Sequence, residues 1–534
     1  MDILLLDCTL RDGGYINDWN FGLNTTISVI ERLVEANMDV IEVGFLDERQ
    51  PFNIERTIQP DTSCYDKILA GIDRKNSMLV AMIDYGTCGL DKIAPCKESL
   101  LDGIRVIFKL PKMREAVAFG RELTKLGYAV FLQMVSITSY SDRDVLDFVD
   151  LVNEEPPYGV SMVDTYGLLH KDELLHYFHL LDYNLHPSIR IGYHSHNNFQ
   201  LAYANTCEVI KRKARHAIIV DGTLYGMGKS AGNAPVELIA MYLNENYGKS
   251  YDLSQLLEAI DTNIMNIYRE KYWGYNLLYF LAASNDCHPS YISYLLDKKT
   301  LSVKAINEIV AQIPHNKKLD YDKVCIKQLY TRYQKQYLHG AHSIHALKSA
   351  LEGKKVLLLG PGKTVVEYRE KIDEYIAQNE PVVITTNFVP KYYKAQYIFI
   401  SNAKRYSMLS TAFKRMENHI GVIATSNVTP VGDSFDYVLD YDQLLVNDHR
   451  IEDNSVIMLL KALTQCGPEK VVLAGFDGYS KESKKNYYSD FMEFSFDYEY
   501  LAEVNTAVKE ILPKLCEGLD ISFLTPSAYH SDEV

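Results

Sequence analysis

Near the start of the chain stands Ile3-Leu4-Leu5-Leu6-Asp7-Cys8-Thr9-Leu10-Arg11-Asp12-Gly13, a short apolar run followed by polar residues and a glycine. This pattern is typical of a buried β-strand that ends in a loop. Similar runs recur through the first half of the chain, with helix-like segments such as Thr26–Ala36 and Met113–Leu126 between them. The eight predicted strands are Ile3–Asp7, Val40–Phe45, Leu79–Asp84, Ile104–Leu110, Ala129–Val135, Val160–Asp164, Ile189–His194 and Ile218–Asp221.

Eight strands that alternate with helices predict a TIM barrel, in which parallel strands close into a cylinder inside a ring of helices. We assign residues 1–250 to this (β/α)8 barrel, because such barrels typically take ~250 residues. Residues 251–350 place apolar side chains at helical spacing, as in Leu253–Tyr268 and Val303–Ile313, and predict a helical extension.

From Lys354 onward a second series of short apolar runs alternates with helical stretches. The runs are KKVLLLGPG, PVVITTN, AQYIFISN, HIGVIATSN, DYVLDY, KVVLAGFDG and DISFLTP. They predict that residues 351–534 form a Rossmann-like α/β domain with an open, mainly parallel sheet.

Composition restricts the class of protein. The 534 residues contain 55 Lys and Arg against 70 Asp and Glu, a formal net charge of -15, which opposes binding to the phosphate backbone of nucleic acids. The nine Cys residues form no C-x-x-C pair, so we expect reduced thiols in a cytoplasmic protein. No stretch approaches the ~18 apolar residues of a membrane span, and the first residues lack a signal-peptide pattern. We therefore expect neither nucleic acid nor a membrane as a partner.

Two polar motifs are predicted at strand ends on the face where TIM barrels place their chemistry. Arg11 and Asp12 follow the first strand and could serve an anion and a cation, with a surface salt bridge as the alternative. His194 and His196 are two residues apart at the end of the seventh strand and so point to the same side. With the Asp12 carboxylate they would give a divalent ion two nitrogen ligands and one oxygen ligand.

A glycine-rich loop, Gly222–Glu237, follows the eighth strand and leads into a helix that Pro235 marks near its first turn. The glycines would let the backbone approach a ligand closely, whereas the alternative is only a tight connection.

Five motifs, taken in order, resemble those of the DRE-TIM metallolyases, a family that includes 4-hydroxy-2-oxovalerate aldolase, hydroxymethylglutaryl-CoA lyase, isopropylmalate synthase and homocitrate synthase. The resemblance covers residues 1 to about 240. The motifs are D-x-T-L-R-D-G at Asp7–Gly13, I-E-V-G-F at Ile41–Phe45, D-T at Asp164–Thr165, H-x-H-N at His194–Asn197 and G-x-G-x-x-x-G-N-A-P at Gly226–Pro235.

The resemblance implies a metal site. Asp12, His194 and His196 would ligate a divalent ion, Mn2+ or Mg2+ and less often Zn2+, and Asn233 matches a further ligand of some members. Such an ion suits carbon–carbon bond chemistry, because the enolate that forms needs positive charge at its oxygen.

The resemblance also implies roles for other residues. Arg11 would contact the substrate carbonyl oxygen, and Glu42 would hold Arg11 by a charge-assisted pair. Asp164 and Thr165 would contribute to substrate binding.

One position departs from the family pattern. In the hydroxyketoacid aldolases a His, thought to be the general base, follows shortly after R-D-G, whereas Tyr15 stands there in this chain. A phenol of pKa near ~10 is a poor base at neutral pH but can donate or relay a proton. His288 in the helical extension is a second candidate, with a loop histidine of no catalytic role as the alternative.

The second half of the chain carries weaker sequence signals of a ligand-binding site. Leu359-Gly360-Pro361-Gly362-Lys363-Thr364 follows an apolar run and could place amides near a phosphate, but Leu357 breaks the P-loop pattern and Val365 the G-x-G-x-x-G pattern. A purely structural turn is the alternative. The segment Leu473–Gly478 also ends a predicted strand, where open sheets bind ligands.

These observations leave three functional hypotheses. The first is an aldolase that joins or splits a 2-oxo acid such as pyruvate and an aldehyde, acting as a homo-oligomer. The second is a Claisen-type synthase that condenses acetyl-CoA with a 2-oxo acid, although such synthases carry R-D-G-E-Q where this chain has Gly14 and Tyr15 after Gly13. The third is a nucleotide- or sugar-binding module on a barrel scaffold. We prefer the aldolase.

Overall fold

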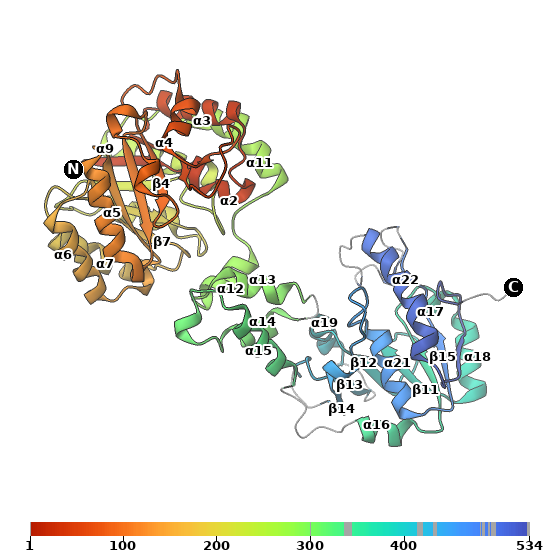
Figure 1. Ribbon diagram of the computed structural model, residues 1–534. Coiled ribbons are helices and arrows are strands. Elements are labelled where there is room, and N and C mark those ends of the chain that lie inside the picture. Colours follow the sequence, from red (N-terminus) through yellow and green to blue (C-terminus); the bar gives the residue numbers. More distant parts are fainter. Residues whose placement is uncertain are drawn as a thin grey trace. The chain divides into compact units, whose positions relative to one another are not determined.

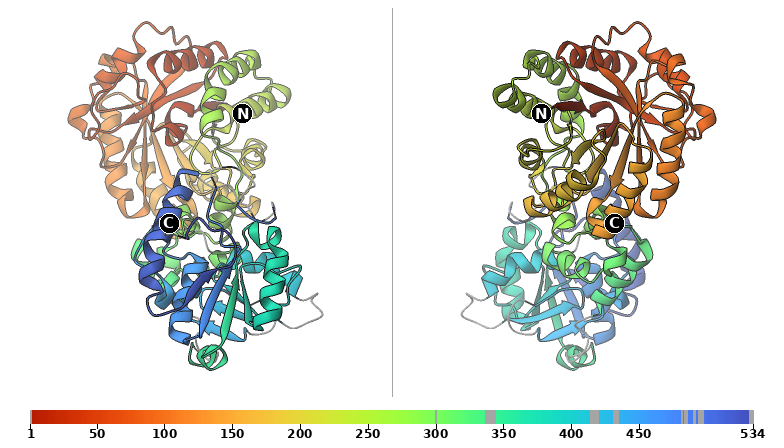
Figure 2. Two further views of the ribbon diagram at one scale, coloured as in Figure 1. Left: turned by 90° about the vertical axis from the view of Figure 1, so that its right-hand side faces the viewer. Right: turned by 90° about the vertical axis from the view of Figure 1, so that its left-hand side faces the viewer.

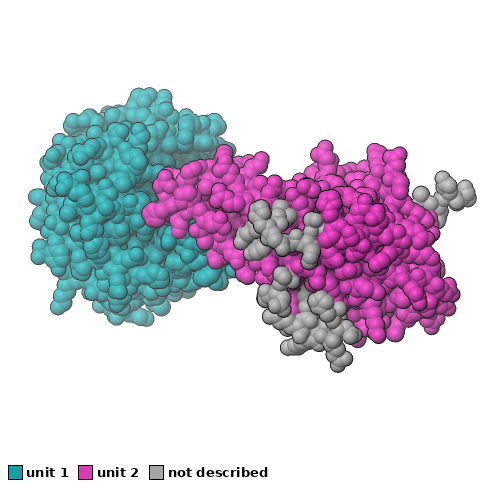
Figure 3. Space-filling model, turned by 90° about the horizontal axis from the view of Figure 1, so that it is seen from below, with its two compact units in different colours: residues 1–289 teal, residues 290–534 magenta. Residues whose placement is uncertain are grey.

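The computed structural model describes residues 2–298, 301–335, 344–413, 420–430, 435–480, 482, 486–489, 492 and 498–530. The chain divides into two compact units, Met1–Pro289 and Ser290–Val534, which Figure 3 shows in different colours. The boundary between the units falls inside the predicted helical extension.

Unit 1 is a closed barrel of eight parallel strands, which confirms the predicted TIM barrel. The strand order is β1-β9-β8-β7-β6-β5-β4-β2, and the cylinder closes where Leu6 pairs with Val40. A two-residue strand, β3 (Ile58–Gln59), adds to β2 at its end. The barrel strands are β1 (Ile3–Asp7), β2 (Val40–Leu46), β4 (Met78–Asp84), β5 (Gly103–Phe108), β6 (Ala129–Val135), β7 (Gly159–Asp164), β8 (Arg190–Ser195) and β9 (Ile218–Gly222).

Helices surround the barrel strands (Figures 1 and 2). The connection from β4 to β5 differs, because it contains two 3-10 turns, Leu90–Lys92 and Cys96–Glu98, in place of an α-helix. The outer helices are α3 (Leu23–Glu35), α4 (Thr62–Leu69), α5 (Met113–Lys125), α6 (Asp142–Glu154), α7 (Lys171–Asn184), α8 (Ala202–Ile210) and α9 (Val236–Tyr247).

Alternation along the strands separates two apolar layers. In β1, Ile3 and Leu5 pack into the large core between strands and helices. Leu6 instead joins a small cluster inside the barrel with Val40, Val80, Phe131 and Ile219. The barrel interior is thus closed by apolar side chains.

Polar side chains occupy the layer next to this cluster. Glu42 stands two residues after Val40 in β2, and Asp221 pairs with Leu6, so both face the interior. Arg105 pairs with Met82, which stands two residues after the interior Val80. All three charged side chains are completely or almost completely buried.

The elements described between residues 251 and 350 are helical. None of the described helices is both long enough and apolar enough to cross a membrane. The α-helices in this stretch are α10 (Leu253–Ala259), α11 (Met265–Glu270), α12 (Leu277–Ser284), α13 (Pro289–Leu296), α14 (Val303–Val310), α15 (Lys323–Gln334) and α16 (Ile344–Leu351).

Unit 2 contains an open sheet of seven strands, all parallel, in the order β14-β13-β12-β11-β10-β15-β16. This confirms the predicted second α/β domain with a parallel sheet. The strands are β10 (Lys355–Leu359), β11 (Val382–Thr386), β12 (Tyr397–Ile400), β13 (Gly421–Thr425), β14 (Tyr437–Leu439), β15 (Lys470–Ala474) and β16 (Ile521–Phe523).

Helices cover both faces of the second sheet. Val356 and Leu358 of β10 pack with α16, α21 (Ser455–Cys466) and α22 (Tyr498–Leu515). Leu357 and Leu359 point the other way and pack with Ile372 of α18 (Arg369–Asn379). The continuous apolar run of β10 follows from this burial on two sides.

Candidate metal site at the barrel mouth

The predicted metal ligands come together at the carboxyl end of the barrel strands. Asp12 ends the short helix α1 (Thr9–Asp12), which follows β1. His194 lies in β8 and His196 directly after it, while Asn233 lies in the loop between β9 and α9. All four side chains are buried.

The ligand atoms of Asp12 and of the two imidazoles converge without hydrogen-bonding to one another. The Oδ2 atom of Asp12 lies 3.9 Å from Nε2 of His194 and 3.8 Å from Nε2 of His196. One ligand atom from each of these three residues lies within 4.8 Å of the others. These separations exceed a hydrogen bond but are compatible with a shared ion at ~2.0–2.2 Å from each atom.

Hydrogen bonds fix which nitrogen each imidazole presents. Nδ1 of His194 lies 3.0 Å from a carboxylate oxygen of Asp221, and Nδ1 of His196 lies 3.1 Å from the backbone carbonyl of Lys229. Both acceptors require a proton on Nδ1, which leaves the Nε2 lone pairs directed toward Asp12. Burial lowers the pKa of His196 to about 4, so its ring stays in the neutral, metal-binding form.

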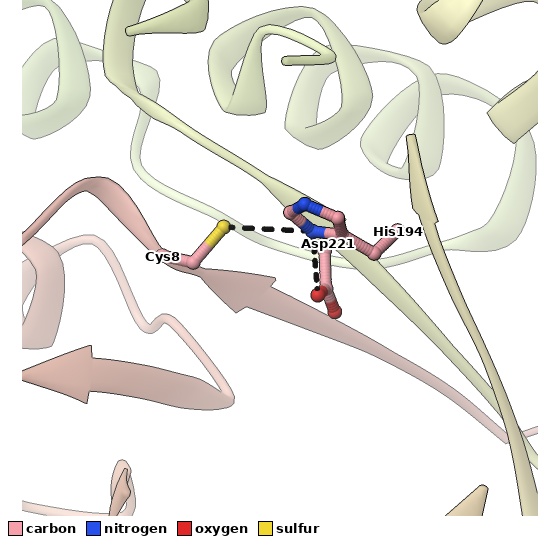
Figure 4. Close-up of side chains that lie close together, drawn as sticks. All are labelled: Cys8, His194 and Asp221. Atoms are coloured by element: carbon pink, nitrogen blue, oxygen red, sulfur yellow. Dashed lines mark hydrogen bonds and ion pairs between the residues drawn. The ribbon is translucent and has the colours of Figure 1, made fainter. Parts of the chain in front are cut away.

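A second group of ligand-type side chains surrounds the opposite nitrogen of His194. Figure 4 shows Cys8, His194 and Asp221, which also come within 4.8 Å of one another. The Cys8 thiol is 4.0 Å from Nδ1 and donates to the Gly222 carbonyl at 3.4 Å, and burial raises its pKa well above the ordinary value. Because Asp221 already accepts hydrogen bonds from His194 and Arg105, this group is suited to orienting His194.

Asn233 places an amide group beside Asp12, His194 and His196. Its Nδ2 donates to Asp12 Oδ2 and to the Met227 carbonyl, whereas its buried Oδ1 has no hydrogen-bond partner among the described residues. A buried acceptor without a donor calls for an ion or water. One carboxylate, two imidazoles and an orphaned amide oxygen therefore fit a divalent cation.

Two carboxylates hold Arg11 beside the proposed metal ligands. Its Nε donates to Glu42 at 2.7 Å, and its Nη1 donates to Asp12 at 2.9 Å. Its backbone carbonyl accepts a bond from the indole of Trp19 at 2.8 Å. The two carboxylates leave Nη2 of the guanidinium without a protein acceptor among the described residues.

A buried chain of alternating charges connects Arg11 to His194. Glu42 accepts from Arg11 and also lies 3.1 Å from Nη1 of Arg105, whose Nη2 pairs with Asp221. Sequence analysis missed Arg105 and Asp221 as site residues. The signal available was a charged residue inside an apolar strand, in Gly103-Ile104-Arg105-Val106 and in Ile219-Val220-Asp221.

Tyr15 and Lys229 lie together at the mouth. The Lys229 ammonium is 5.3 Å from the centre of the Tyr15 ring, within the range of a cation–π contact. Although Tyr15 as a residue is exposed, desolvation of its hydroxyl group and the Asp12 carboxylate raise its pKa to about 12. The phenol is therefore protonated at neutral pH and suited to donating a proton.

Lys229 was not predicted as a site residue. Burial lowers its pKa, as do the charges of Lys109 and Arg11. Among the described residues no carboxylate lies within ion-pair distance of its ammonium group. The half-buried cation at the mouth is thus available to an anion.

The remaining predicted residues lie around the end of β7. Both carboxylate oxygens of Asp164 accept backbone N–H groups, from Leu168 at 2.8 Å and Leu169 at 3.1 Å, and burial raises its pKa to about 7. The Thr165 hydroxyl accepts the Ser136 N–H at 2.8 Å. The His288 ring lies edge-on to Tyr166, 5.8 Å between ring centres, so His288 reaches this same loop.

The fold and the ligand set define a TIM barrel with a candidate divalent-metal site at its mouth. Residues 2–262 match the family model described as HMGL-like, which confirms the resemblance to the DRE-TIM superfamily for the barrel. This superfamily contains lyases, aldolases and condensing enzymes.

Individual relatives match about half of the chain. The 4-hydroxy-2-oxovalerate aldolase of Marinomonas sp. (strain MWYL1) is 27% identical over 270 residues, 49% of this chain and 77% of the relative. The 2-isopropylmalate synthase of Prochlorococcus marinus is 28% identical over 284 residues, 49% of this chain and 51% of the relative. The crystal structure of the HMG-CoA lyase of Bacillus subtilis has 17% identity and a TM-score of 0.40, covering 50% of this chain and 93% of that chain.

Proposed function

We propose that the barrel is a divalent-metal-dependent aldolase that forms or cleaves a carbon–carbon bond through the enolate of a 2-oxo acid such as pyruvate. The observation that carries the proposal is the convergence of Asp12, His194 and His196 on one point beside Arg11. Mn2+ and Mg2+ are the preferred ions, and Zn2+ is less favoured.

Asp12, His194, His196 and Asn233 would hold the ion. When bound, a divalent cation supplies positive charge to the oxygen of a developing enolate. The protein contributes the orientation of the two imidazoles, because Asp221 and the Lys229 carbonyl accept hydrogen bonds at Nδ1 and leave Nε2 to face the ion.

Arg11 would bind the same enolate oxygen through the N–H groups of its guanidinium. Glu42 and Asp12 fix its guanidinium, so its free N–H groups are oriented before the substrate arrives. Preorganised donors of this kind cost no reorganisation when negative charge develops.

Tyr15 would donate a proton at its hydroxyl oxygen, since the phenol stays protonated. Lys229, beside the Tyr15 ring, would attract the carboxylate of the 2-oxo acid. Asp164 and Thr165 would shape the substrate-binding face through the loop bonds they make.

The local structure around Gly14 favours an aldolase over a Claisen-type synthase. A Cβ atom at Gly14 would lie 2.0 Å from the Trp19 indole, so no side chain fits there. A Glu at this position, as in the R-D-G-E-Q pattern, would require Trp19 to move. The condensation of acetyl-CoA with a 2-oxo acid is accordingly the second candidate function of the barrel.

Cleavage of 4-hydroxy-2-oxo acids tests the proposal. The purified full chain, loaded with Mn2+, should release pyruvate from members of a series that differ in the aldehyde portion. The same preparation should not release free CoA from acetyl-CoA in the presence of 2-oxo acids. CoA release without pyruvate formation would overturn the proposal in favour of the synthase.

A further inference from the structure

β5 places a charged side chain inside the barrel. Ile104, Val106 and Phe108 of this strand pack into the core between strands and helices, so the alternating Arg105 points to the interior. Arg105 is completely buried, with 0% of its surface exposed. A guanidinium in such a place needs carboxylate partners, because an unpaired buried charge is strongly destabilising.

The partners of Arg105 come from three other strands of the barrel. Its Nη1 lies 3.1 Å from Oε2 of Glu42 in β2, and its Nη2 donates to Oδ2 of Asp221 in β9. Nη2 also donates to Oε1 of Gln133 in β6 at 3.1 Å. A single planar group therefore contacts two carboxylates that belong to different strands.

Both carboxylates also serve the proposed active site, and they do so through the oxygen that contacts Arg105. Oε2 of Glu42 accepts Nε of Arg11 at 2.7 Å. Oδ2 of Asp221 lies 3.0 Å from Nδ1 of His194, the contact drawn in Figure 4. The second oxygen of each carboxylate has no hydrogen-bond partner among the described residues. The orientation of each carboxylate thus depends on the two donors that share one oxygen.

A purely structural role is the alternative for this network. Taking charges out of water costs about as much as their attraction returns, so a buried ion pair adds little net stability. The neighbouring layer of the barrel interior is filled by apolar side chains, among them Val80 and Phe131. The charges beside that layer are better explained by the groups that they hold, Arg11 and His194.

We propose that Arg105 is a positioning residue, which orients His194 toward the metal and Arg11 toward the enolate oxygen by fixing Asp221 and Glu42. This inference rests on the proposed metal site and on the proposed aldolase chemistry. Because Arg105 is fully enclosed, it acts through the two carboxylates. A change at this one side chain therefore affects the metal ligand and the oxyanion-binding group together.

Arg105→Lys tests the role in the full chain. Lys keeps the positive charge but replaces the planar fork by a single nitrogen, which cannot hold both carboxylates in the same arrangement. The probe is Co2+, because nitrogen and oxygen ligands bind it and its visible absorption changes with ligand geometry. We expect an altered Co2+ spectrum, a Kd for Co2+ raised about tenfold or more, and a kcat of the Mn2+-loaded protein lowered by a similar factor.

Phe131→Leu is the matched control. Phe131 pairs with Arg105 across β5 and β6 and is 1% exposed, but it belongs to the apolar cluster of the interior. Its substitution removes buried volume and should lower the melting temperature while the Co2+ spectrum stays unchanged. Equal spectral changes in Phe131→Leu and Arg105→Lys, or no change in either, would overturn the positioning role.

Gln133→Leu covers the case in which Arg105→Lys does not fold, as circular dichroism would show. This variant removes one acceptor from Arg105 and leaves every charge in place. It should change the Co2+ spectrum while Phe131→Leu does not. An unchanged spectrum in folded Gln133→Leu would then overturn the role of Arg105.

The Co2+ measurements need no substrate, so they separate this inference from the proposed function. Altered Co2+ binding by Arg105→Lys, with no aldol cleavage by the unsubstituted chain, would support the role of Arg105 toward the metal and reject the aldolase. Aldol cleavage by the unsubstituted chain, with Co2+ binding and kcat unchanged in Arg105→Lys, would support the aldolase and overturn the role of Arg105. An unsubstituted chain that binds no Co2+ would overturn both.

Discussion

At the level of single residues, the two imidazoles that we propose as metal ligands depend on the groups that bind their other nitrogens. Asp221 and the Lys229 carbonyl keep Nδ1 protonated, so that Nε2 of both rings can ligate. Arg11 depends in the same way on Glu42. Residues outside the proposed ligand set therefore determine how the proposed ligands and Arg11 are oriented.

Removal of either imidazole should abolish metal binding. His194→Ala or His196→Ala deletes one of two nitrogen ligands from a site with few ligands to spare, so bound metal and turnover should both be lost while the fold is retained. Elemental analysis and circular dichroism measure these outcomes. Stoichiometric metal with full activity in either variant would rule out the assigned ligands.

Arg11→Lys should retain metal but lose most activity, because Lys keeps the charge without the planar fork that Glu42 and Asp12 orient. The measurement is kcat at saturating metal, and the expected loss is more than about tenfold, ~1.4 kcal/mol. A smaller change would reject Arg11 as the group that stabilises the oxyanion.

Tyr15→Phe and His288→Gln compare the two candidates for proton transfer. If Tyr15 donates the proton, Tyr15→Phe should slow deuterium exchange into the pyruvate methyl group with little change in pyruvate affinity, and His288→Gln should not. The reverse result would assign the step to His288. Unchanged exchange in both variants would remove both residues from proton transfer and leave metal-bound hydroxide as the base.

Lys229→Met should raise the KM for pyruvate by about tenfold or more, because the half-buried ammonium has no carboxylate partner in the described part of the protein. Lys213→Met, at an exposed lysine of the same unit, is the control and should leave KM unchanged. Equal KM values for the two variants would show that Lys229 does not contact the carboxylate.

At the level of elements, all eight barrel strands and the parallel sheet of unit 2 could be predicted, because apolar runs of this length between turn residues are strong local signals. β3 could not, since Ile58 and Gln59 are too few to form a pattern. The β4–β5 connection likewise lacks the helix expected of a regular repeat.

The site was predictable only where its residues follow a motif. Asp12, His194, His196 and Arg11 stand in short sequence patterns, and the structure brings them together. Arg105 meets Glu42 and Asp221 only because the strands close into a cylinder, so contacts across such sequence distances require the fold. That Lys229 has no carboxylate partner among the described residues likewise cannot be deduced without the fold.

At the level of the whole molecule, each of the two units has its own apolar core. We therefore expect two unfolding transitions in calorimetry of the full chain. Mn2+ at about one hundred times its Kd should stabilise the barrel by ~2.7 kcal/mol and raise one midpoint by roughly 5–10 °C, leaving the other in place. A single transition, or equal shifts of both midpoints, would contradict independent units.

The most direct test of the proposed aldolase follows the methyl protons of pyruvate by NMR in deuterated water. Exchange requires the enolate but no aldehyde, so it tests the chemistry without knowledge of the second substrate. We predict exchange by the Mn2+-loaded protein, loss of exchange after chelation and recovery when Mn2+ is restored. Protein that contains one equivalent of metal yet exchanges no deuterium would contradict enolate chemistry at Asp12, His194 and His196.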